Sequence, residues 1–98
     1  MDAREKDFLK AMTELLERRK EVLGHPSTRV IQMVSNYGAV EAARRIINIP
    51  QDTTGLVELW EKRRLDLSIQ TLVLRFPDLF TDEEMGKAQE TLERLERK

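Results

Sequence analysis

Apolar side chains in this chain recur at intervals of three and four residues, and charged side chains fill the positions between them. The spacing is clearest near the start of the chain, at Phe8, Met12, Leu15, Leu16, Val22 and Leu23. An α-helix gathers residues spaced in this way onto one face, whereas a strand needs strict alternation. No segment is a serious strand candidate, so we predict an all-α fold.

Glycine, proline and capping residues set the ends of the predicted helices. Gly24 can take the left-handed conformation that closes a helix, and Pro26 prevents that helix from continuing. Ser27 is a suitable N-cap for a second helix that ends at Gly38. The later predicted helices cover residues 39–48, a segment that begins at Thr53 or Thr54, residues 67–75 before Pro77, and residues 81–97, where Thr81 and Glu84 form a capping box.

Each predicted helix carries one apolar face, which we expect to be buried. The second helix would bury Val30, Ile31, Val34 and Tyr37, and the third would bury Val40, Ala43, Ile46 and Ile47. In the remaining helices the expected core residues are Leu56, Leu59, Ile69, Leu72, Val73, Met85, Ala88, Leu92 and Leu95.

A chain of 98 residues can enclose one apolar core but not two of independent stability. We therefore predict a compact single-domain bundle of five to six helices with long first and last helices. The long first helix occupies residues 1–24, a compact helical centre residues 27–76, and the last helix residues 81–97. We expect the two terminal helices to lie against one another, and the alternative is a homodimer formed through the N-terminal helix.

The composition argues against an enzyme, a metal site or a bound cofactor. There is no cysteine, and the single histidine, His25, lies between a glycine and a proline at a helix end. A hydrolase with a nucleophilic side chain needs a base such as histidine beside that side chain, and a transition-metal site needs several histidine or cysteine ligands close together. The four glycines are scattered singly, so no phosphate-binding loop is present. We interpret His25 as a capping or surface residue.

Charge and hydropathy indicate a cytoplasmic protein with no membrane segment. The first residues alternate in charge and precede no apolar block, which is unlike a secretory signal. The longest apolar runs are only a few residues, far short of a membrane span. There are 17 basic and 18 acidic residues, so the chain lacks the basic excess typical of nucleic-acid-binding proteins.

The segment from Leu59 to Ser68 is the most informative for partner binding. We interpret Trp60 first as a core anchor, and the alternative is a binding hot spot, because such spots favour tryptophan and arginine. Arg64 is expected to pair with Asp66, Glu61 or Glu41. The candidate partner-binding residues are Trp60, Lys62, Arg63, Arg64, Arg44 and Arg45.

A nucleic-acid partner is the alternative to a protein partner. Residues 37–47 have a sequence pattern similar to that of the first helix of a helix-turn-helix. The next helix, which carries Lys62, Arg63 and Arg64, would be the recognition helix. Together with Arg29, Arg44 and Arg45 these residues would form a basic patch. The connection over residues 48–53 is too long for the motif, and Glu58 and Glu61 would oppose phosphate contact.

Several short motifs in a fixed order resemble a known kind of domain. They are Tyr37-Gly38 with Glu41-Ala42-Ala43-Arg44-Arg45, then Leu59-Trp60-Glu61, Arg64-Leu65-Asp66-Leu67-Ser68, Leu72-Val73-Leu74, and Leu79-Phe80-Thr81 with Glu83-Glu84. The pattern, over roughly residues 27–95, is similar to a small helical domain of uncharacterised bacterial and phage-borne proteins. Gly55-Leu56 departs from the glycine-aromatic pair often found there.

The resemblance implies a compact helical domain and assigns no activity. The hypothesis that follows from the residues is a non-enzymatic interaction module with a protein partner. Nucleic-acid binding is the second hypothesis. The settings in which members of this family are found imply a third hypothesis, that the protein is an accessory factor or inhibitor in bacterial and phage conflict.

Overall fold

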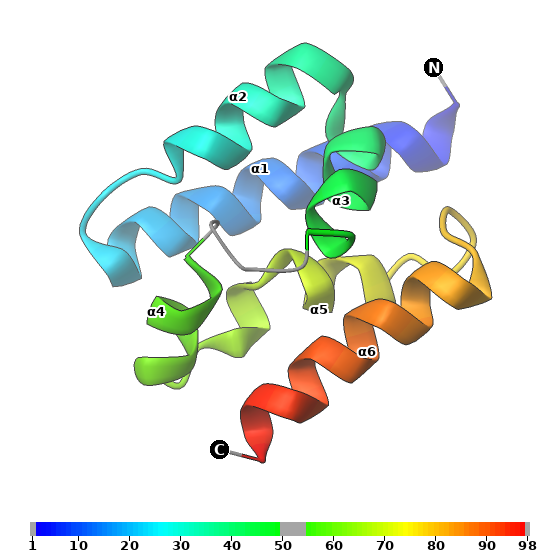
Figure 1. Ribbon diagram of the computed structural model, residues 1–98. Helices are drawn as coiled ribbons and strands as arrows, with labels where there is room; N and C mark the ends of the chain where they lie inside the picture. The colour runs from blue at the N-terminus through cyan, green and yellow to red at the C-terminus, as the bar shows by residue number, and fades with distance from the viewer. Residues whose placement is uncertain (1, 50–54, 98) are drawn as a thin grey trace.

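The computed structural model describes residues 2–49 and 55–97, whose regular secondary structure consists of helices with no strand (Figure 1). The helices are α1 (Ala3–Leu23), α2 (Thr28–Tyr37), α3 (Ala39–Ile47), α4 (Leu56–Glu61), α5 (Ile69–Leu74) and α6 (Asp82–Glu96), and a 3₁₀ turn, η1 (Leu65–Leu67), precedes α5. The first and last helices are the longest, at 21 and 15 residues. The predicted all-α fold is confirmed.

The residues predicted to end and begin helices mostly do so. Gly24 closes α1 with a left-handed φ of 78°, and the predicted capping box of Thr81 and Glu84 begins α6. The helix predicted at residues 67–75 begins later, at Ile69, because Ser68 caps α5 by accepting a hydrogen bond from the Thr71 amide at 3.1 Å. Ser27 is the N-cap of α2, although its side chain makes no capping hydrogen bond. The start predicted at Thr53 or Thr54 lies outside the described residues.

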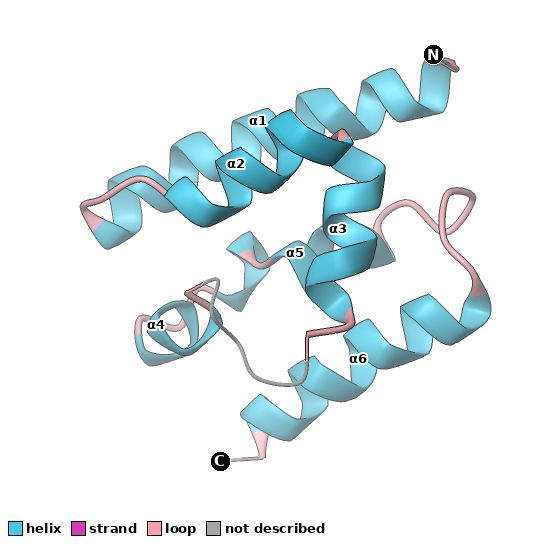
Figure 2. Cartoon of the chain, turned by 45° about the horizontal axis from the view of Figure 1, so that its top comes forward, coloured by secondary structure: helices cyan, strands magenta, loops and turns pink. Residues whose placement is uncertain are grey.

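Two central helices separate the two terminal ones. Helix α1 packs against α3, α5 and η1, whereas α6 packs against α5 and α3. Helix α2 lies at the outer edge and packs mainly on α3, and α4 is held beside η1 (Figures 1 and 2). The expected pairing of the terminal helices is therefore wrong, because the apolar faces of both helices are occupied by the central helices.

One apolar core joins α1 to the rest of the chain. Phe8 and Met12 of α1 are fully buried, as predicted from their spacing. The ring of Phe8 meets the rings of Phe76 and Phe80 edge to face, with centroid distances of 5.0 and 5.4 Å. The other predicted residues in the core cluster are Leu15, Val30, Ala43, Ile46, Ile47, Ile69, Leu72, Val73 and Ala88.

Two residues predicted to be buried on α2 are exposed. Ile31 and Tyr37 each keep 47% of their surface accessible, while Val30 is buried. The reason is that α2 uses a narrow face, since it packs mainly on α3 and not on several neighbours. Tyr37 is partly covered, because the Arg45 guanidinium lies 4.0 Å from its ring centroid.

A buried arginine lies at the junction of α1 and α4. Arg19 is 1% exposed, which its sequence position among other charged residues did not predict. Burial of a charged side chain is tolerated only where polar groups lie close to it. Gly55, just before α4, lies close to the Arg19 side chain: a Cβ atom at Gly55 would lie 3.0 Å from the Arg19 guanidinium.

We expect Gly55→Ala to destabilise the fold more than Gly24→Ala does. Both glycines have a left-handed φ, of 86° and 78°, but nothing lies within 4 Å of a Cβ placed at Gly24. Gly24→Ala should cost about 1 kcal/mol from backbone conformation alone, and Gly55→Ala roughly 2 to 4 kcal/mol because Arg19 must also shift. Urea unfolding measures both. Equal losses would show that Arg19 does not restrict this site.

Candidate interaction surfaces

The structure ends α4 at Glu61, so Lys62, Arg63 and Arg64 follow the helix and do not lie on it. The chain turns here because Arg63 has a positive φ of 59°. The Arg63 amide donates to the Trp60 carbonyl at 3.0 Å, and the Arg64 amide donates to the Leu59 carbonyl at 2.8 Å. These two bonds form the Schellman arrangement, in which the left-handed position is usually a glycine.

Arg63 is the one non-glycine residue with a positive φ among the described residues. A left-handed conformation costs a residue with a Cβ about 1 to 2 kcal/mol, and glycine avoids this cost. Gly24 holds the same left-handed conformation at the end of α1. The arginine at position 63 is therefore held at a cost to stability. Sequence reasoning missed this strain because arginine gives no signal for a left-handed turn.

Trp60 is half-buried and is not among the fully buried residues of the core, so part of its side chain stays accessible. It lines an open hollow, which we call the Trp60 hollow, with Glu61, Arg63, Leu65, Asp66 and Glu96. Glu96 comes from the end of α6, far away in the sequence. The hollow thus combines an indole, an aliphatic side chain and charges of both signs, and only the fold brings Glu96 to it.

Arg64 does not offer a free charge to this hollow. Its Nε and Nη2 atoms donate to the two carboxylate oxygens of Asp66 at 3.1 and 3.2 Å. The side-chain hydrogen bonds from Arg64 lower the pKa of Asp66 and outweigh the opposing effect of burial. Of the three partners predicted for Arg64, the structure selects Asp66.

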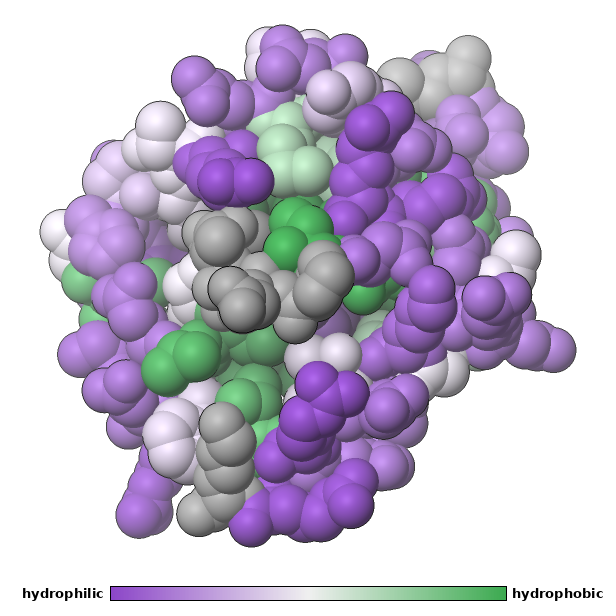
Figure 3. Space-filling view, in the orientation of Figure 1, coloured by the Kyte–Doolittle hydropathy of each residue, from purple (hydrophilic) through white to green (hydrophobic). Residues whose placement is uncertain are grey.

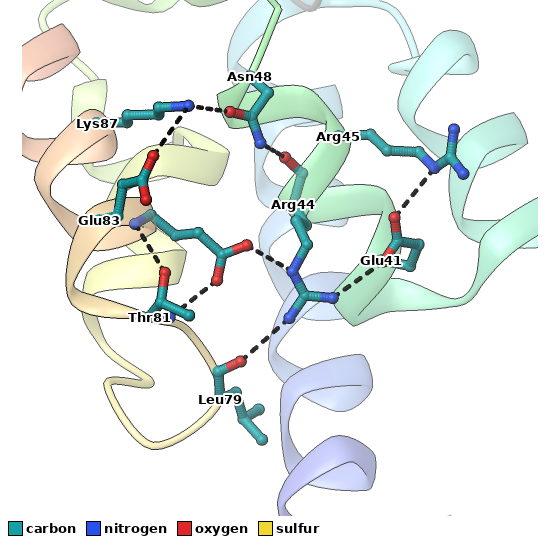
Figure 4. Close-up of polar contacts among 9 residues, drawn as sticks. Glu41, Arg44, Arg45, Asn48, Leu79, Thr81, Glu83 and Lys87 are labelled. Atoms are coloured by element: carbon teal, nitrogen blue, oxygen red, sulfur yellow. Dashed lines mark hydrogen bonds and ion pairs between the residues drawn. The ribbon is translucent and has the colours of Figure 1, made fainter.

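Arg44 is the centre of a polar network between α3 and α6 (Figure 4). Its Nε donates to Glu84 Oε2 at 2.5 Å, its Nη1 to Glu41 Oε1 at 3.0 Å, and its Nη2 to the Leu79 carbonyl at 3.5 Å. Burial acts to raise the pKa of Glu84, but the Thr81 amide and the Arg44 guanidinium together lower it. Arg44 therefore fixes the start of α6 against α3.

Arg45 is also engaged within the chain. Its Nε donates to Glu41 Oε2 at 3.2 Å, and its guanidinium stacks on Tyr37. Glu41 thus contacts both arginines of α3. About half of the Arg45 side chain stays accessible. Arg44 and Arg45 act first as structural residues of α3.

The predicted basic residues do not meet in one patch. Arg44 and Arg45 lie on α3, and Lys62 and Arg63 lie beyond α4, on a different part of the molecule (Figure 1). Arg29 lies near the start of α2. Of the surface hollows found among the described residues, none is lined both by an α3 arginine and by a basic residue that follows α4.

Comparison with known proteins adds no assignment: no protein-family model, curated protein or solved structure matches the chain. The resemblance to a bacterial and phage-borne domain stays a prediction. Across the described residues, no three histidine or acidic side chains are placed to hold a metal ion. Within the same residues, every helix is too short or too polar to cross a membrane. Hydrophilic side chains cover most of the face seen in Figure 3.

We expect Arg63→Gly to raise the free energy of unfolding by about 1 kcal/mol, because glycine takes the left-handed conformation without strain. Thermal or urea unfolding measures this change. Lys62→Gly is the matched control, since Lys62 has a φ of −89° and glycine there only adds freedom to the unfolded chain. A lower stability of Arg63→Gly would mean that the Arg63 side chain stabilises the turn.

The turn between α1 and α2 is tied to the helix that carries Trp60. His25 Nε2 and Glu58 Oε2 lie 3.1 Å apart, and both side chains are about half exposed. The hydrogen bond with Glu58, and then the one with the Pro26 carbonyl, raise the pKa of His25 above its ordinary value of 6.5. Arg19 opposes this shift by its charge. Protonation of His25 thus favours the attachment of α4.

Stability should fall as the pH rises through the pKa of His25. Because the folded-state pKa is raised, the stabilisation is fully present below 6.5 and is lost above the raised value. Unfolding measured between about pH 5.5 and about pH 8.5 tests this, with Glu58→Gln as the control. The difference in stability between wild type and control should shrink at the upper end. A constant difference would contradict the prediction.

Proposed function

We propose that this chain is a non-enzymatic helical interaction module that binds a protein partner through the Trp60 hollow. The observation that supports the proposal most is the left-handed arginine at its edge, Arg63. Strained residues with side chains cluster at functional sites, because selection for stability alone would replace them. Arg63 lies beside the exposed part of Trp60, the only tryptophan of the chain.

The chemistry of the hollow suits a protein surface. Tryptophan and arginine are the residues most often found at the energetic centre of protein interfaces. Trp60 and Leu65 offer apolar area, and Arg63 can donate to a carboxylate or a backbone carbonyl of a partner. Glu61 and Glu96 can accept hydrogen bonds from a basic side chain. We therefore expect a partner segment with one apolar anchor and flanking polar groups.

Nucleic-acid binding is less well supported. Arg44 and Arg64 are engaged by carboxylates in the chain, and Arg45 contacts Glu41 and Tyr37. Helix α4 has six residues, among them Glu58 and Glu61, which is short and acidic for a reading helix. A homodimer through α1 has little apolar surface to use, because Phe8, Met12 and Leu15 are buried within the chain.

Comparative affinity capture tests the proposal. Four tagged proteins would be expressed in the organism whose genome encodes the chain: wild type, Trp60→Ala, Arg63→Gly and Val57→Ser. The proteins captured with each would be quantified by mass spectrometry. We expect one partner to be retained by wild type and Val57→Ser and lost with the other two variants. Arg63→Gly is the decisive variant, because a loss of binding by a more stable protein cannot come from unfolding.

The captured partner must then bind directly. With purified proteins, Arg63→Gly or Trp60→Ala should weaken binding by at least about 2 kcal/mol, the size of an interface hot spot. Equal capture by all four proteins would reject the hollow as the binding surface. Binding of duplex or single-stranded DNA that weakens steeply with salt would favour the nucleic-acid alternative instead.

A further inference from the structure

Most aromatic rings of this chain carry one of its own arginines over one face. The rings with such a guanidinium, at centroid distances of 4.0 to 5.8 Å, are those of Phe76, Phe80 and Tyr37. Phe8 is fully buried in the core. Trp60 is the remaining ring, and no cation among the described residues lies over it. Tryptophan is the aromatic side chain that attracts a cation most strongly, so the Trp60 ring is well suited to a cation from outside the chain.

Two carboxylates line the Trp60 hollow together with this ring. Glu61 follows Trp60 directly in the sequence, and Glu96 reaches the hollow from the end of α6. Neither carboxylate forms an ion pair with another residue that the structure describes. Arg63 lines the hollow as well, but its guanidinium pairs with neither Glu61 nor Glu96. The negative charge of these two side chains is therefore not neutralised by the arginine at the edge.

An arginine side chain of a partner fits this combination of groups best. A planar guanidinium can stack on an indole by its face and still donate hydrogen bonds in its own plane to carboxylates. A neutral side chain would gain only the contact with the ring, and an acidic one would be repelled by Glu61 and Glu96. Lysine has a compact, strongly hydrated charge and cannot stack in this way. The three rings that carry a cation within the chain all carry an arginine.

We propose that the Trp60 hollow binds an arginine side chain of the protein partner, stacked on Trp60 and paired with Glu61 and Glu96. The inference rests on the proposed function, because it takes the same hollow as the binding surface. It names one of the polar groups that flank the apolar anchor of the partner. Arg63 then contacts a carboxylate or a carbonyl of the partner, so both signs of charge in the hollow meet a complementary group.

Fluorescence titration with short peptides tests the arginine, because Trp60 is the only tryptophan of the chain and its emission reports on the hollow. The full chain would be titrated with a tripeptide that has arginine between two glycines and is blocked at both ends. The same peptide with citrulline has a similar shape without the charge, and a third has lysine. The arginine peptide should change the emission saturably, with a dissociation constant on the order of millimolar. The lysine peptide should bind roughly threefold more weakly or worse, and the citrulline peptide should give no saturable change.

Neutral variants of the two carboxylates test how the arginine is held. Glu61→Gln and Glu96→Gln should each raise the dissociation constant of the arginine peptide about threefold, because each removes one ion pair. Glu83→Gln is the matched control, since its side chain is 84% exposed at the opposite end of α6, and it should leave the constant unchanged. Circular dichroism checks that all three variants are folded. Equal binding of the arginine and citrulline peptides, tighter binding of the lysine peptide, or equal effects of the three substitutions would overturn the proposal.

Failure of this inference can be distinguished from failure of the proposed function. The double variant Glu61→Gln/Glu96→Gln would be added to the capture experiment. A partner that is lost with Trp60→Ala and Arg63→Gly but fully retained by the double variant would bind the hollow without the proposed arginine, which overturns this inference alone. Loss of the partner with the double variant as well would support it. Equal capture by all variants would reject the hollow and both proposals together.

Discussion

The contact of Phe8 with Phe76 and Phe80 holds the architecture together. It joins the first helix to the segment between α5 and α6, so the chain closes around α3 and α5. Edge-to-face pairs of this kind contribute about 0.5 to 1.5 kcal/mol each beyond the area they bury. Arg4 covers the outer side, with its guanidinium 4.7 Å from the Phe76 ring centroid and its Nε 2.6 Å from Asp78. Without this closure, α3 and α5 would have an apolar face open to water.

Much of the charge in this chain stabilises the arrangement of its helices. Arg44 binds Glu84 of α6 and Glu41 of its own helix, and Glu84 also belongs to the capping box. The same carboxylate therefore begins a helix and docks it. The number of basic residues overstates the positive charge that is available to a partner, because several arginines already donate hydrogen bonds to carboxylates within the chain. Function must be sought where a side chain is not explained by folding.

Periodicity and capping rules predicted the helices and most of the core, because both depend on neighbours in the sequence. They could not orient α2 correctly, since the exposure of Ile31 and Tyr37 depends on how few helices pack on it. The burial of Arg19 was not predicted either, because a charged residue among other charged residues gives no sequence signal of burial. Of the candidate site, Trp60 and Arg63 were named from the sequence, but the left-handed backbone and the contribution of Glu96 required the structure.

The C-terminal ends of α1 and α4 share one backbone conformation but differ in the residue that adopts it. Both helices end in a left-handed residue, but glycine is used after α1 and arginine after α4. Since the backbone requirement is the same, the difference must lie in what the side chain does. Gly24 adds nothing beyond the turn, whereas Arg63 extends a charged group over the edge of a hollow lined by Trp60 and Leu65. The strain at Arg63 is therefore the reason that we propose a binding role for this residue.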